Sequence, residues 1–130
     1  MAEIEIKPVG RVESPLTERA QAPKQGDEGA PEAWIVFEPD LVDALQGIEP
    51  GDEVLVLTWL DRGDRDVLQT RPRDDPANPL QGVFNTRSPD RPNPIGLHPV
   101  TVVAIEWSRM LVSELEALDG TPVIDVKPVI

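Results

Sequence analysis

The sequence predicts a mainly β fold, a small β-barrel with long loops and one short helix, in one domain over residues 1–130. Three observations predict it. The apolar stretches are short and several of them alternate with polar residues, as in strands. The 15 Pro and 9 Gly residues separate these stretches with turns. The chain of 130 residues suits a single hydrophobic core.

The first half of the chain predicts two strands, a loop and the helix. Ile and Val recur between polar residues over 4–12, which predicts an early strand. Residues 17–31 are polar and contain Pro and Gly, so we expect a long loop, a kind of segment that often binds ligands. Residues 34–37 predict a strand, and residues 39–45 predict one or two helical turns.

The second half predicts further strands. The nearly continuous apolar run at 53–60 predicts the strongest strand, buried on both faces. A short strand at 67–70 and a loop at 74–80 follow. The remaining strands are expected at 97–107, with Val100, Val102 and Ile105 facing the core, and at 110–115 and 123–126.

The run Gly82–Leu97 holds the most informative segment. Three prolines within Pro89–Pro94 exclude a helix interior and a central strand, so this segment is predicted to be a stiff, extended loop. Arg87, Arg91 and Asn93 lie beside these prolines. A rigid loop presents polar groups at little ordering cost, which favours a ligand-binding loop over a plain surface turn.

Charge is distributed unevenly along the chain. The net charge is −12, yet residues 61–91 hold six Arg and six Asp and are neutral. All six cations are Arg, which suits bidentate contacts to carboxylate or phosphate. Local salt bridging within 61–66, where the charges alternate, is the alternative for Arg62 and Arg65. The acidic remainder favours solubility.

Several kinds of chemistry are absent from the sequence. There is no Cys, and the only His is His98, expected to be structural, so a multi-histidine metal site is excluded and no metal is expected. Neither a Walker loop nor a Gly-x-Gly-x-x-Gly motif occurs. No signal peptide or membrane-spanning run is found, so we expect a cytoplasmic protein without a membrane partner.

Four segments together resemble one family. The run Gly82–Leu97 resembles the signature of the TsaA-like proteins, the TrmO family of tRNA methyltransferases. Ile6–Pro15 is similar to the family's opening strand and Ser-Pro turn, Leu57–Arg62 to its central strand, and Asp119–Pro128 to its closing motif. The resemblance spans essentially the whole chain.

The resemblance implies a single-sheet β-barrel that binds S-adenosyl-L-methionine and acts as a homodimer. It implies methylation of N6 of threonylcarbamoyladenosine next to the anticodon of threonine tRNA. The chain resembles a short form without the C-terminal domain of longer members. Together with the net charge of −12, this leaves two alternatives open: a small-molecule methyl acceptor, and a non-catalytic module that binds S-adenosylmethionine.

The resemblance also implies site residues, position by position. Asp61 or Glu116 would accept hydrogen bonds from the cofactor, Arg87 or Arg62 would bind its carboxylate, and Leu97 would pack against it. The full set of implied cofactor contacts is Gln25, Gly26, Asp61, Arg62, Arg87, Leu97, Ser113, Glu114, Leu115 and Glu116.

The acceptor side of the expected site has fewer candidates. Arg91 and Asn93 are candidates for binding the substrate. Asn93 and Asp119 are also the candidate catalytic residues at the acceptor. A turn-forming role for Asp119 and a loop-bracing role for Asn93 are the alternatives.

Overall fold

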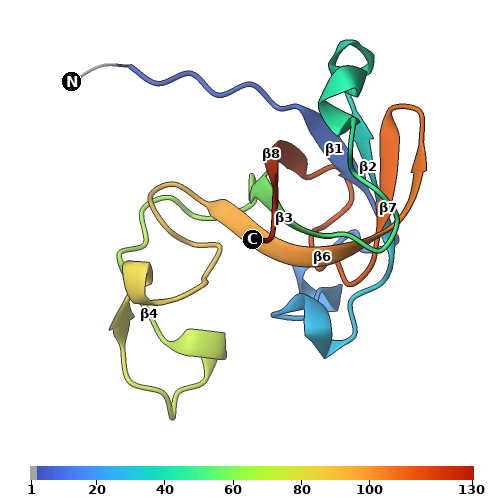
Figure 1. Cartoon of the computed structure of the whole chain (residues 1–130). Coiled ribbons are helices and arrows are strands. Elements are labelled where there is room, and N and C mark those ends of the chain that lie inside the picture. Colours follow the sequence, from blue (N-terminus) through green and yellow to red (C-terminus); the bar gives the residue numbers. More distant parts are fainter. Residues whose placement is uncertain (1–2) are drawn as a thin grey trace.

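The structure, a computed structural model, describes residues 3–130 and confirms a mainly β architecture (Figure 1). Six strands form one antiparallel sheet in the order β1-β2-β7-β6-β3-β8. The sheet closes on itself because β1 pairs with both β2 and β8. We call it the strand ring; its members are β1 (Gly10–Glu13), β2 (Ala33–Phe37), β3 (Glu53–Trp59), β6 (Ile95–Glu106), β7 (Arg109–Val112) and β8 (Pro122–Pro128).

The core fills the inside of the strand ring. Successive side chains of a strand point to opposite faces, so every second residue faces inward. β2 follows this rule with Ala33, Ile35 and Phe37 buried, and the same alternation continues in β1 and β7. The fully buried side chains include Val12, Ile35, Val56, Val102, Met110, Val112, Leu115 and Val123.

The expected short helix is confirmed as the 3-10 helix η3 (Pro39–Leu45). Pro39 begins it, which suits the first turn because proline lacks an N–H to pair, and Leu45 anchors its end in the core. The predicted loop at 17–31 contains two further one-turn helices, η1 (Arg19–Gln21) and η2 (Gly26–Glu28). Within residues 3–130, no helix is long and apolar enough to cross a membrane.

Three predicted strands are clearly shorter than expected, and the one expected at 110–115 already ends at Val112, in β7. β1 begins at Gly10 and not at residue 4, and the strand expected at 67–70 is reduced to β4 (Gln69–Thr70). Residues 3–9 are outside regular secondary structure, although the Val9 N–H still donates to the Val123 carbonyl. The alternating apolar residues predicted a strand from residue 4, but residues 3–9 do not pair as a strand with a neighbouring strand.

Burial of β3 also differs from the prediction. Val54, Val56 and Thr58 are buried, whereas Leu55 and Leu57 are only partly buried. β3 lies between antiparallel neighbours in a closed sheet, so one of its faces meets the core and the other does not. In β6, Val100 and Val102 are buried as predicted, and Ile105 packs against the core while partly exposed.

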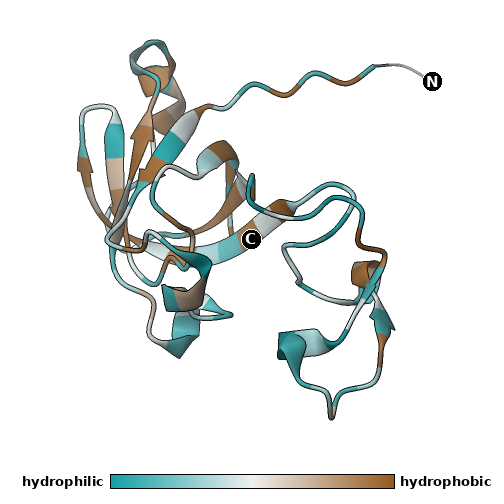
Figure 2. Ribbon diagram, turned by 180° about the vertical axis from the view of Figure 1, so that it is seen from behind, coloured by the Kyte–Doolittle hydropathy of each residue, from teal (hydrophilic) through white to brown (hydrophobic). Residues whose placement is uncertain are grey.

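Residues 60–94 leave the strand ring between β3 and β6 and return to the same end, and we call them the excursion. They contain β4, η4 (Pro72–Asp74), β5 (Gln81–Gly82) and η5 (Val83–Asn85), with β4 and β5 paired in a separate two-stranded sheet. Figure 1 shows the excursion beside the ring, and Figure 2 shows that much of it is hydrophilic. The six-arginine window at 61–91 lies entirely within the excursion.

Candidate functional site

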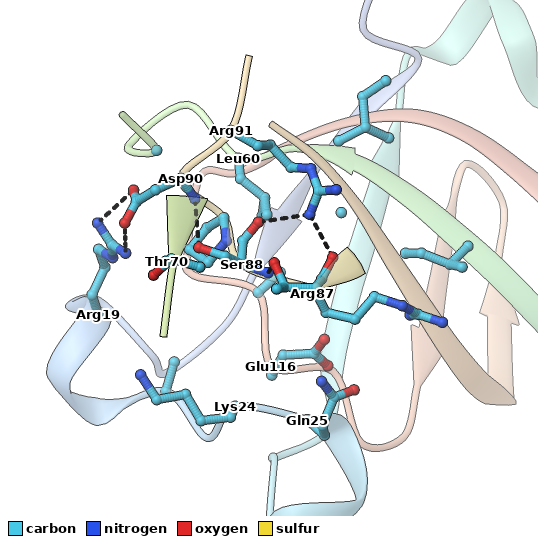
Figure 3. Close-up of a pocket in the computed structure, with 18 of the residues that line it drawn as sticks. Arg19, Lys24, Gln25, Leu60, Thr70, Arg87, Ser88, Asp90, Arg91 and Glu116 are labelled. Atoms are coloured by element: carbon cyan, nitrogen blue, oxygen red, sulfur yellow. Dashed lines mark hydrogen bonds and ion pairs between the residues drawn. The ribbon is translucent and has the colours of Figure 1, made fainter. Parts of the chain in front are cut away.

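A cavity of about 690 Å³ lies between the excursion and one end of the strand ring (Figure 3). Its walls come from the excursion, the loop before η2, the first residues of β6 and the segment at 116–121. The volume is typical of a site for a small ligand or cofactor. The cavity lining contains eight of the residues predicted for the site: Gln25, Asp61, Arg62, Arg87, Arg91, Asn93, Leu97 and Glu116.

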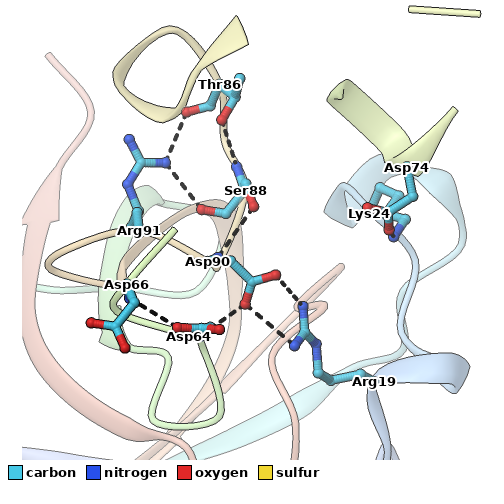
Figure 4. Close-up of polar contacts among 9 residues, drawn as sticks. All are labelled: Arg19, Lys24, Asp64, Asp66, Asp74, Thr86, Ser88, Asp90 and Arg91. Atoms are coloured by element: carbon cyan, nitrogen blue, oxygen red, sulfur yellow. Dashed lines mark hydrogen bonds and ion pairs between the residues drawn. The ribbon is translucent and has the colours of Figure 1, made fainter. Parts of the chain in front are cut away.

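The proline-rich loop is held in shape by Arg91. Its guanidinium donates to the backbone carbonyls of Thr86 at 2.8 Å and Ser88 at 3.0 Å (Figure 4). It also donates to the Val83 carbonyl at 2.8 Å. Prolines stiffen the segment, and these bonds fix how it folds back on itself. Arg91 thus acts as a brace for the loop, although it was predicted to bind the substrate.

Asp90 ties this loop to two neighbouring segments. Its carboxylate accepts the backbone N–H of Asp64 at 2.9 Å and both terminal guanidinium nitrogens of Arg19 (Figure 4). Burial raises the pKa of the Asp90 carboxyl, but the Asp64 N–H and the Arg19 hydrogen bond outweigh it, so the pKa lies below its usual value. The loop is therefore joined to η1, and both residues of this ion pair line the cavity.

Two more ion pairs connect the excursion to the loop at 17–31. Lys24 pairs with Asp74 at 3.3 Å, and Arg73 pairs with Glu28. The Arg73 hydrogen bond lowers the pKa of the Glu28 carboxyl. Such exposed pairs add little to stability individually, so they orient the two walls more than they stabilise the fold.

The other arginines of the excursion mostly donate to backbone carbonyls. Arg62 donates to the Thr17 carbonyl, and Arg65 donates to the Pro92 carbonyl and to Asn93 Oδ1 at 2.9 Å. Ion pairs between neighbours in 61–66 do not form, so the local salt-bridge alternative is not what the structure shows. Asn93 does brace the loop, through Arg65, and it also lines the cavity.

Arg87 differs from the other five arginines of the excursion. In the part of the chain that the structure describes, no hydrogen bond or ion pair to protein engages its guanidinium, which lines the cavity. The partners of the other five are Thr17 for Arg62, Pro92 and Asn93 for Arg65, Asn78 for Arg71, Glu28 for Arg73, and Val83, Thr86 and Ser88 for Arg91. A cation in a cavity wall without a protein partner suits an anionic group of a ligand.

Gly26 brings two predicted segments together. A Cβ at this position would collide with the carbonyl oxygen of Glu114 and would lie 3.1 Å from Glu116 Oε2. The absence of a side chain therefore lets η2 pack directly on residues 113–116. Gly26 and Glu114 line an adjoining cavity of about 290 Å³, and Gln25 lines both cavities.

Three predicted residues do not line either cavity. Ser113 Oγ lies within hydrogen-bonding distance of the Thr101 backbone, and Leu115 is fully buried in the core. Asp119 Oδ1 accepts the backbone N–H of Ser14 at 3.0 Å, and its own N–H donates to the Leu16 carbonyl. Asp119 thus ties the closing turn to the Ser-Pro turn, a local structural role.

The cavity floor contains His98, which is 3% exposed. His98 Nε2 lies 2.7 Å from Thr58 Oγ1, and His98 Nδ1 lies 2.6 Å from Glu116 Oε1. Gly96, opposite Thr58 across the β3–β6 pair, leaves room for this contact, because a Cβ there would meet both Thr58 Oγ1 and His98 Nε2. The expected structural role of His98 therefore includes contact with a wall residue of the site.

Sequence reasoning missed several wall residues. Lys24 and Thr121 line the cavity, and so does Phe84, which is 86% exposed. An aromatic residue inside an otherwise polar loop was the available signal for Phe84. Within residues 3–130, no group of three or more His, Asp and Glu side chains is arranged to hold a metal ion.

Comparison with known proteins gives consistent matches. Residues 11–130 match the family described as the tRNA-methyltransferase O N-terminal domain. The chain is 45% identical to a "Probable S-adenosyl-L-methionine-binding protein" of Methanothermobacter thermautotrophicus, over 97% of this chain and 90% of that protein. It is 42% identical to an S-adenosyl-L-methionine-binding protein of Archaeoglobus fulgidus, over 94% of this chain and 86% of that protein.

A solved structure extends the match to three dimensions. The crystal structure of TrmO from Pseudomonas aeruginosa superposes on this chain with a TM-score of 0.79 at 28% sequence identity. The superposition covers 100% of this chain and 56% of that chain, so the present sequence spans a little over half of the solved protein.

Proposed function

Because the chain belongs to the tRNA-methyltransferase O N-terminal domain family, we propose that it binds S-adenosyl-L-methionine in the 690 Å³ cavity and transfers its methyl group. Family membership and the names of the two archaeal relatives support the cofactor. The observation that carries the proposal is Arg87, a cavity-lining arginine without a protein partner for its guanidinium among residues 3–130. Glu116 and the apolar Leu97 line the same cavity.

The chemistry of the cavity wall fits this cofactor. Arg87 can bind a carboxylate group with paired hydrogen bonds. Glu116 and Asp61 can accept hydrogen bonds from an ammonium or from ribose hydroxyls. Leu97, 38% exposed and lining the cavity, offers an apolar surface for an adenine ring. The wall thus supplies a cation for the carboxylate of the cofactor, anions for its ammonium and ribose hydroxyls, and an apolar surface for its adenine.

The cofactor supplies a methyl group on a cationic sulfur, which needs no further activation. The protein's contribution is then mainly positioning, since aligned reactants avoid much of the entropic cost of meeting. The braced loop serves this purpose, because Arg91 and the prolines hold Arg87 and Asn93 in a fixed frame. Asn93 remains our candidate for contacting the acceptor, and Asp119 would act only by holding the closing turn.

For the acceptor, we propose N6 of threonylcarbamoyladenosine next to the anticodon of threonine tRNA. Family membership supports an RNA substrate, and two features of the excursion suit one. It holds six of the 12 basic residues of a chain with net charge −12, so its six Asp are balanced by six Arg. Phe84, exposed at the cavity, offers a face on which an unstacked base can lie.

The acidic charge favours a second candidate, a small-molecule acceptor, and a non-catalytic module that binds S-adenosylmethionine is the third. An overall charge of −12 opposes a polyanionic partner outside the excursion. Purified chain, labelled cofactor and threonylcarbamoylated tRNA distinguish the candidates. Methyl label in tRNA supports the first. Cofactor binding without label in tRNA, but with label in a metabolite extract, supports a small acceptor. Binding without transfer to either supports the module.

We further propose a cytoplasmic homodimer. Leu68 and Leu80, 68% and 51% exposed on the excursion, are apolar side chains that an interface would cover. Sedimentation equilibrium should give a mass about twice the 14.3 kDa of one chain. A single-chain mass across the concentration range would contradict the dimer.

Calorimetric titration with S-adenosylmethionine and with S-adenosylhomocysteine tests the cofactor site. We expect about one site per chain. Arg87→Ala should weaken binding by about 1.5–3 kcal/mol, the value of a charge-assisted hydrogen bond. Arg11→Ala is the matched control, because Arg11 is an exposed arginine on β1 that lines neither cavity. Equal affinities of the two variants would show that Arg87 does not contact the cofactor.

A further inference from the structure

A buried hydrogen-bond chain connects the inside of the strand ring to the cavity. It runs from Thr58 on β3 through His98 on β6 to Glu116, with heavy-atom distances of 2.7 and 2.6 Å. The Thr58 residue is 0% exposed, and the side chains of His98 and Glu116 are 4% and 15% exposed. The proposed methyl transfer assigns no role to Thr58 or His98.

The two hydrogen-bond partners of His98, Thr58 and Glu116, select one tautomer of its imidazole. The Thr58 hydroxyl has no other hydrogen-bond partner among residues 3–130, so its proton is satisfied only by donation to His98 Nε2. Nε2 then carries no proton, and Nδ1 carries it and donates to Glu116 Oε1. The opposite tautomer would leave the buried hydroxyl proton unpaired and set a bare Nδ1 against a carboxylate oxygen, which costs free energy.

The same chain fixes the Glu116 carboxylate. Oε1 is committed to His98, and Oε2 lies next to Gly26, where no side chain intervenes. Gln25 and Arg87, which are labelled with Glu116 in Figure 3, line the same cavity. Oε2 is therefore the oxygen left for a ligand, and its direction is set by the imidazole.

We propose that His98 is a positioning residue for ligand binding. As the neutral Nδ1–H tautomer, braced by Thr58, it holds Glu116 so that Oε2 accepts a hydrogen bond from a hydroxyl or ammonium group of the ligand. The identity of that ligand as S-adenosylmethionine rests on the proposed function, whereas the hydrogen-bond chain does not.

Nitrogen-15 NMR of the imidazole tests the chain without any ligand. His98 is the only histidine, so its ring signals need no assignment. At about pH 8 we expect the Nδ1–H tautomer with a bare Nε2, as the hydrogen bonds to Thr58 and Glu116 require. The Nε2–H tautomer, or a rapidly averaged mixture of both, would overturn the proposal. This measurement uses the unaltered protein, so it does not depend on any variant folding.

Two substitutions of His98 test the effect on the ligand. His98→Asn can place an N–H near the position of Nδ1 and keep the donor to Glu116. His98→Gln instead reaches the position of Nε2 and Thr58, and loses the donor to Glu116. We expect S-adenosylmethionine affinity within about threefold of wild type for His98→Asn and about tenfold or more weaker for His98→Gln, the range for one hydrogen bond to a charged group.

A merely structural histidine predicts a different pattern. Each variant keeps one half of the buried chain, so both would lose similar amounts of stability and of affinity. Equal affinity losses, with wild type binding normally, would overturn the positioning role and leave the proposed function intact. Failure of the wild type to bind would refute the proposed function, and with it the role of His98 toward that ligand, even if NMR showed the expected tautomer.

Discussion

Replacing Gly96 with Ala should disrupt the contact between Thr58 and His98. The added Cβ would lie 2.6 Å from His98 Nε2, about 0.8 Å short of the 3.4 Å at which ordinary contact begins, and it would also collide with Thr58 Oγ1. Neither side chain can yield easily, because both are buried and hydrogen-bonded to each other. Relief requires breaking that hydrogen bond or displacing β6 from β3.

The expected destabilisation follows from three terms. Overpacking a dense interior costs about 1–3 kcal/mol. Loss of the Thr58–His98 hydrogen bond costs about 0.5–1.5 kcal/mol. The alanine offsets about 0.4–1 kcal/mol by restricting the unfolded chain. The free energy of unfolding should therefore fall by about 0.5–4 kcal/mol. The affinity for S-adenosylmethionine should also weaken, because Glu116 loses its support.

Urea unfolding of wild type, Gly96→Ala and Gly82→Ala measures this effect. Gly82 is the matched control, since nothing lies within 4 Å of its added Cβ and its φ of −62° suits alanine. Gly82→Ala should leave stability unchanged or raise it by up to about 1 kcal/mol. Gly96→Ala with wild-type stability would refute the reasoning, because it would mean that the β3–β6 contact yields freely.

Two further predictions concern the proline-rich loop. Arg91 uses two nitrogens, Nη1 for the Thr86 and Ser88 carbonyls and Nη2 for the Val83 carbonyl, and the single ammonium of Arg91→Lys cannot occupy both positions. Hydrogen exchange in residues 83–91 should therefore accelerate and stability should fall by about 1–3 kcal/mol. Unchanged exchange would contradict the bracing role. The pKa of the Asp90 carboxyl is lowered in the folded protein. Its ionised form therefore adds to the free energy of unfolding at pH values above the unfolded pKa of about 3.9, and this stabilisation is lost as the pH falls through the folded pKa. The difference in urea stability between wild type and Asp90→Asn should therefore shrink from pH 7 to about pH 3, and a constant difference would show that the Asp90 charge is not involved.

The sequence determined most of the local elements and the identity of the key loop. Short apolar runs predicted β2, β3 and β7, because a strand-forming run is a property of consecutive residues. The prolines marked the loop at 89–94, because they exclude a helix and a central strand wherever they occur. The excess of Arg at 61–91 was equally visible, and it coincides with the excursion.

Only the tertiary structure decided what those side chains do. Arg91 and Arg87 are four residues apart in one loop. Arg91 donates to three backbone carbonyls, whereas Arg87 lines the cavity and its guanidinium has no protein partner within residues 3–130. Glu116 and His98 meet because β6 and the segment at 116–121 pack side by side. The closure of the sheet determines which residues far apart in sequence become hydrogen-bond partners. A pattern of consecutive residues cannot predict those partners.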